Sequence, residues 1–129
     1  QLSNGKESIM EYLIAIASTD GKVINQHFGR AKEFIIAKVY NNKEYAFLEK
    51  RLVNPPCNGG EHEEETLEEV IAVLSDCKYI LCSQIGRVAE VNLRSRGMIA
   101  FDIAHFIDYA IEKIMKYDEK FNKNIYIKL

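Results

Sequence analysis

The chain has 129 residues, a length typical of one domain with a substantial core. Hydrophobic residues make up 47% and charged residues 28%, and the formal net charge of −2 gives no electrostatic reason to expect a nucleic acid partner. No apolar run approaches the ~20 residues of a membrane-spanning helix, and residues 1–7 lack the apolar core of a secretory signal. Three cysteines cannot all pair within one chain, so we expect free thiols and a reducing, cytoplasmic setting.

The first half of the chain predicts three strands that follow one another as a meander. Residues 13–17 and 34–40 are apolar runs typical of buried strands, and an Asp-Gly turn signal lies between them. Two asparagines, which tolerate left-handed backbone geometry, then predict a hairpin turn. Residues 44–53 should return as the third strand, with Tyr45 and Phe47 facing the core, and two prolines end it.

The second half alternates helices with strands. Apolar residues at helical spacing predict helices over residues 63–75 and 87–96 and from residue 103 onward. Short apolar runs at 78–83 and 98–101 predict the strands between these helices.

Some details of the second half can be checked one by one. We expect Val88 and Phe106 to face the core and Asp102 to cap the last helix. The end of the chain is polar up to residues 125–129, which should add an edge strand or be disordered.

The element order βββαβαβα predicts an α/β fold in which one mixed sheet of five strands carries helices on its faces. We expect residues 1–11 to be a linker or tag-like segment, 12–117 the folded domain and 118–129 a tail. Ligands of open α/β sheets bind beyond the C-terminal ends of the parallel strands, so the turns that follow the first, fourth and fifth strands should converge there.

His27, in the turn after the first strand, is the first candidate ligand-binding residue. A neutral imidazole can ligate a metal or act as a general base. Gly29 admits a bulky group near the backbone, and Arg30 can neutralise an anion. Gly86 starts a helix whose backbone N–H groups, together with Arg87, can form an anion site. Alternatively, His27 only hydrogen-bonds its own loop.

Cys57 and His62 are a second candidate pair. Thiolate and imidazole suit iron–sulfur species, zinc or copper, yet two ligands do not complete a structural zinc site, and a plain polar loop is an equally open interpretation. Cys77 and Cys82 are assigned to the core because free cysteine is among the most buried residue types. The sequence holds no nucleophile–base motif, which disfavours catalysis by this domain alone.

Several of these stretches occur together in one known family. They are Ile14–Ser18, Asp20-Gly21, Asn25–Ala31, Phe34, Leu74–Lys78, Ile85-Gly86, Leu93–Gly97 and Phe106–Ala110. In this combination, over about residues 13–116, the chain resembles the dinitrogenase iron–molybdenum cofactor biosynthesis family, the NifX/NafY group. The loop Cys57–Gly60, which precedes an acidic helix, is most similar to the C-terminal domain of NifB proteins.

The resemblance implies a three-layer α/β/α, ribonuclease-H-like domain without the nuclease's catalytic carboxylates. Family members bind and carry iron–sulfur or iron–molybdenum cofactor precursors during nitrogen fixation. His27 falls at the family's histidine position and becomes the leading cluster ligand, and Cys57 and His62 match positions in the NifB-type loop. The implied partners are nitrogenase cofactor assembly proteins or apo-nitrogenase.

The resemblance further implies a carrier or accessory domain with no enzymatic activity of its own, which in NifB proteins follows a radical-SAM enzyme domain. Two alternatives stay open. One is a metal-free regulatory or docking domain that contacts cluster-assembly proteins. The other is a small enzyme, for which Asp20 and Asp102 are the only plausible carboxylate pair.

Overall fold

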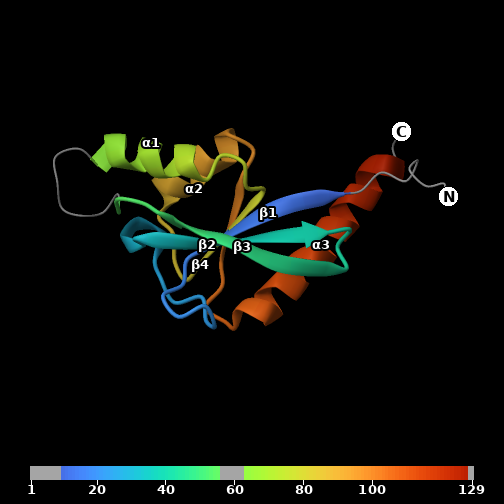
Figure 1. Cartoon of the computed structure of the whole chain (residues 1–129). Helices are drawn as coiled ribbons and strands as arrows, with labels where there is room; N and C mark the ends of the chain where they lie inside the picture. Colours follow the sequence, from blue (N-terminus) through green and yellow to red (C-terminus); the bar gives the residue numbers. More distant parts are fainter. Residues whose placement is uncertain (1–9, 56–62, 128–129) are drawn as a thin grey trace.

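The computed structural model describes residues 10–55 and 63–127 (Figure 1). Its elements, in chain order, are β1 (Glu11–Ile16), the short 3-10 helix η2 (Phe28–Arg30), β2 (Glu33–Tyr40), β3 (Glu44–Leu52), α1 (Glu63–Val73), β4 (Tyr79–Cys82), α2 (Arg87–Ser95), β5 (Ile99–Asp102) and α3 (Ile107–Ile127).

The five strands form one mixed sheet, as the sequence predicts, and the structure sets their order in it as β3-β2-β1-β4-β5. β1 pairs antiparallel with β2, which pairs antiparallel with β3. β4 runs parallel to both β1 and β5. A bulge interrupts β3 at Leu48, because Ala37 of β2 pairs with Phe47 whereas the preceding Ile36 pairs with Glu49.

Helices cover both faces of the sheet, which gives the fold three layers (Figure 1). Successive side chains of a strand point to opposite faces, so Ala15 of β1 and Ala17, directly after the strand, pack toward α1 and α2. Ile14 and Ile16 of the same strand pack toward α3. Apolar side chains make up most of both cores. No helix of the described part is long and apolar enough to cross a membrane.

Three side chains that the sequence analysis placed in the core are exposed instead. Phe47 is 53% exposed because it lies beside the bulge of an edge strand, and Phe106 is 59% exposed because α3 begins only at the next residue. Val88, in the first turn of α2, is 70% exposed, while Leu93 of the same helix is buried.

The two ends of α3 also differ from expectation. Asp102 is the last residue of β5 and lies too far before Ile107 to cap the helix. At the other end α3 continues to Ile127, where an edge strand or disorder was expected. Tyr117 and Phe121 lie four residues apart on α3 with ring centroids 4.5 Å apart, a contact that stabilises the helix beyond residue 117.

A buried polar cluster fastens α3 to the sheet. The carboxylate of Asp118, 1% exposed, accepts hydrogen bonds from Lys78 Nζ (2.6 Å), Tyr79 Oη (2.6 Å) and Asn42 Nδ2 (2.9 Å). Tyr12 Oη donates in turn to Asn42 Oδ1 (2.5 Å). Burial alone would raise the pKa of Asp118, but these donors outweigh it and lower that pKa below its ordinary value.

We predict that Asp118→Asn lowers the free energy of unfolding by about 3 kcal/mol near neutral pH, because it breaks a buried charged network. Since the pKa of Asp118 is depressed in the folded state, this contribution is complete above the unfolded pKa of about 3.9 and is lost as the pH falls through the folded pKa. Urea unfolding of wild type and variant at a series of pH values, from neutral to below the folded pKa, measures this loss of unfolding free energy. Glu119→Gln, an exposed neighbour, is the control, and a constant difference between wild type and Asp118→Asn at all pH values would contradict the prediction.

Candidate functional site

The turn that follows β1 is folded around the side chain of Asp20. Its Oδ1 accepts hydrogen bonds from the backbone N–H groups of Lys22 (2.8 Å) and Val23 (3.1 Å) and from Ser18 Oγ (3.2 Å). The backbone donors, Lys22 first, lower the pKa of Asp20. Gly21 has a φ of +74°, a left-handed conformation that glycine adopts without strain. The Asp-Gly pair therefore has a local structural role in shaping this turn.

Backbone hydrogen bonds fasten the next part of the connection to the end of β4. The N–H of Phe28 donates to the carbonyl of Gln84 (2.8 Å), and the N–H of Ser83 donates to the carbonyl of Gln26 (2.9 Å). The ring of Phe28 is fully buried and packs against Phe34, with centroids 5.8 Å apart. This segment is therefore held by backbone hydrogen bonds to the end of β4 and by the packing of the Phe28 ring in the core.

A second set of bonds joins the same connection to the segment before α3. The N–H of Ile24 donates to the carbonyl of His105 (2.9 Å), and the N–H of Ile107 donates to the carbonyl of Lys22 (2.9 Å). The connections that follow β1, β4 and β5 thus converge at the C-terminal ends of the parallel strands, as expected from the topology.

His27 lies at the surface of this convergence. Its backbone is extended, with φ −69° and ψ 141°, and forms a parallel bridge with Gln84. Its carbonyl accepts a hydrogen bond from the N–H of Arg30 (3.1 Å), whereas its imidazole makes no hydrogen bond to another described residue. The ring is exposed on a fixed backbone, which is the arrangement that a ligand contact needs.

The predicted anion-binding residues flank His27 on two elements. Gly29 and Arg30 belong to η2, and Gly86 is the N-cap of α2, directly before Arg87. Both arginines are exposed, and neither forms an ion pair within the described residues. Gly86 has a φ of −76° and open space around it, so its position requires no glycine.

Two of the three cysteines, Cys77 and Cys82, lie in the part of the chain that the structure describes. Cys77 and Cys82 are buried, which confirms their assignment to the core, and burial raises the pKa of each thiol to about 12. Such thiols stay protonated and are poor metal ligands. Cys57 and His62 lie outside the described residues. Within residues 10–55 and 63–127, no three His, Cys, Asp or Glu side chains are grouped to hold a metal ion.

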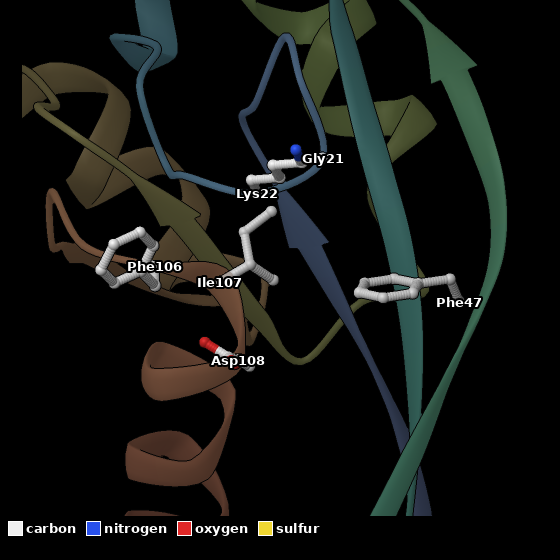
Figure 2. Close-up of a pocket in the computed structure, with 6 residues that line it drawn as sticks. All are labelled: Gly21, Lys22, Phe47, Phe106, Ile107 and Asp108. Carbon is white, nitrogen blue, oxygen red and sulfur yellow. The ribbon is translucent and has the colours of Figure 1, made fainter.

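An open hollow of about 490 Å³ lies on the α3 side of the sheet, between β3 and the start of α3 (Figure 2). It is lined by Gly21, Lys22, Phe47, Phe106, Ile107 and Asp108. None of the predicted site residues that the structure describes lines it. The sequence analysis missed the hollow because it placed both phenylalanines in the core.

Comparison with known proteins identifies the family of this chain. A family model described as dinitrogenase iron-molybdenum cofactor matches residues 10–117. The chain belongs to the dinitrogenase iron–molybdenum cofactor family. This confirms the resemblance drawn from the sequence, and it places His27 and the convergent turns inside the matched region.

The relatives include FeMo cofactor biosynthesis proteins NifB. That of Herbaspirillum seropedicae is 32% identical over 114 residues, which cover 80% of this chain and 22% of the relative. That of Sinorhizobium fredii is 37% identical over 91 residues, which cover 69% of this chain and 18% of the relative. The chain thus spans about a fifth of the length of these curated relatives.

A solved structure supports the fold of this family member. The crystal structure of PH0822 superposes with a TM-score of 0.59, at 23% sequence identity, and the alignment covers 81% of this chain and 88% of that one.

The two glycines of the converging turns should respond differently to alanine. We predict that Gly21→Ala destabilises the fold by about 1 kcal/mol, because alanine is strained at φ +74° although there is room for its Cβ. Gly86→Ala should cost less, about 0.5 kcal/mol, because the backbone at Gly86 suits any residue and alanine is disfavoured there only as a helix N-cap. Thermal and urea unfolding measure both variants, and equal effects would contradict this account of the turn.

Proposed function

We propose that this domain binds an iron–sulfur or iron–molybdenum cofactor precursor as cargo during nitrogenase cofactor biosynthesis. The observation that carries the proposal is the exposed imidazole of His27, presented on a fixed loop at the C-terminal edge of the parallel strands in a member of this family. The names of the NifB relatives supply the biosynthetic setting.

The chemistry of these residues suits a large, anionic, sulfur-rich cargo. The imidazole of His27 would ligate a metal atom of the cluster, while Arg30, Arg87 and the backbone N–H groups at Gly29 and Gly86 would neutralise its charge. A site with few protein ligands holds a cluster loosely enough to release it to the next protein. Cys57 and His62 are proposed as additional ligands on the resemblance of their loop to NifB.

The strand order β3-β2-β1-β4-β5, antiparallel in its first three strands and parallel in the rest, supports a ribonuclease-H-like assignment. In this proposal the domain is an accessory carrier with no catalytic step of its own. Its partners are the cofactor assembly proteins that load it and the apo-nitrogenase or downstream carrier that receives the cargo.

We predict that His27→Ala weakens binding of an iron–sulfur cluster by about tenfold or more, because it removes a direct ligand. The cluster is formed anaerobically from ferrous and ferric iron with sulfide and titrated against the protein, with sulfide-to-iron charge-transfer absorbance as the readout. His105→Ala is the matched control, because His105 is also exposed and stacks on Tyr109, with ring centroids 3.9 Å apart.

A folded wild-type protein that binds no cluster would overturn the proposed function. Equal binding by wild type and His27→Ala would overturn the role of His27. Far-UV circular dichroism of each variant separates these outcomes from a loss of folding.

A second candidate function is docking to a cofactor assembly protein without any cargo. The observation that favours it is the exposed aromatic surface of the hollow, where Phe47 and Phe106 line facing walls (Figure 2). Tyr109, 42% exposed, follows in the first turn of α3. Large aromatic side chains left in solvent near one another are typical of protein–protein contacts.

We predict that Phe47→Asp and Phe106→Asp each weaken binding to purified apo-nitrogenase or a purified assembly protein by about tenfold, because each puts a charge into an apolar contact. Biolayer interferometry measures this affinity. Val88→Asp is the control, since Val88 is equally apolar and exposed but lies on α2, over the other face of the sheet. Docking that is unchanged in both phenylalanine variants would exclude the hollow as the contact.

A further inference from the structure

We propose that Gln84 belongs to the same binding surface as His27, and that its side-chain amide donates a hydrogen bond to an anionic atom of the bound cluster. The inference rests on the proposed function and extends it to a residue that no sequence pattern singles out. It also defines the ligand more narrowly, as a polynuclear metal cluster with acceptor atoms, such as sulfides, beside the metal that His27 contacts.

The placement of Gln84 follows from the parallel bridge that it forms with His27. Bridged residues of neighbouring strands lie about 5 Å apart, and their side chains leave the ladder on the same side. Both residues are exposed. The two backbone bonds that close this ladder, from Phe28 to Gln84 (2.8 Å) and from Ser83 to Gln26 (2.9 Å), hold the pair in register.

The position of Gln84 along the chain supports the same conclusion. It lies just before Gly86, the N-cap of α2, while His27 lies just before η2. A ligand that meets both the imidazole and the first N–H groups of α2 therefore passes over Gln84. The backbone carbonyl of Gln84 already accepts a hydrogen bond from the N–H of Phe28. The side chain of Gln84 makes no hydrogen bond to another described residue.

The chemistry of the amide suits a cluster better than a single ion. The NH₂ group of glutamine offers two donors, and a sulfide or another anionic atom of a cluster is an acceptor for them. A lone divalent cation offers no acceptor, so its affinity should depend on His27 and little on Gln84. Gln84 would thus favour clusters over free metal ions at this site.

The experiment compares two probes: an iron–sulfur cluster formed anaerobically from ferrous and ferric iron with sulfide, and Zn²⁺ alone. We expect Gln84→Ala to weaken cluster binding by about tenfold and to leave Zn²⁺ binding unchanged. Gln84→Glu, of the same size, should weaken cluster binding further, because it places a negative charge beside an anion. Gln26→Ala is the matched control, since the Gln26 amide donates to the carbonyl of its neighbour Asn25 (3.2 Å).

Each other result has a definite meaning. Unchanged cluster binding in Gln84→Ala and Gln84→Glu, with weaker binding in His27→Ala, would overturn this inference and leave the proposed function standing. An equal loss of Zn²⁺ and cluster binding in Gln84→Ala would show that Gln84 acts on the imidazole or the metal itself, which also overturns it. No cluster binding by the folded wild type would remove both proposals. Circular dichroism melting checks that each variant folds.

Discussion

The candidate site depends on the short ladder that joins residues 26–28 to residues 83–84 at the end of β4. These backbone bonds extend the parallel β1–β4 pairing beyond the strands, although the chain after β1 has already left the sheet through the Asp20 turn. Because Phe28 is buried against the core, the backbone of the exposed His27 is tied to the sheet on both sides of the residue. A flexible loop would have to be ordered on ligand binding, at an entropic cost that this arrangement avoids.

The two ends of the sheet have different roles. At the N-terminal ends of β1 and β4, Asp118 gathers its donors in a buried network that fixes α3. At the C-terminal ends, side-chain bonds around Asp20 and backbone bonds between the turns hold the chain, and His27, Arg30 and Arg87 are left exposed. The thiols of Cys77, just before β4, and Cys82, its last residue, are both buried, and burial raises the pKa of each. The described part of the chain therefore offers imidazole and N–H groups to a ligand.

Three apolar side chains predicted to be buried are exposed for one common reason. Phe47, Val88 and Phe106 are apolar and fit a periodic pattern, but periodicity assigns a side chain to a face without showing whether another element covers that face. Phe47 is exposed because it lies next to the bulge at Leu48 on the edge strand β3. Phe106 is exposed because α3 begins only at Ile107. The hollow could not be predicted for the same reason, because Phe47 and Phe106, which line it, are expected in the core from periodicity alone.

The sequence by itself determined the five strands, the three main helices, the mixed sheet and the family, because apolar periodicity, turn residues and a specific combination of short motifs are local properties of the chain. It also identified His27 as a candidate from its neighbours Gly29 and Arg30. Only the tertiary structure decided that Gln84 lies beside His27 and that Phe47 and Phe106 face one hollow. These pairs are far apart in the chain and meet through strand pairing and helix placement, and no local pattern encodes that meeting.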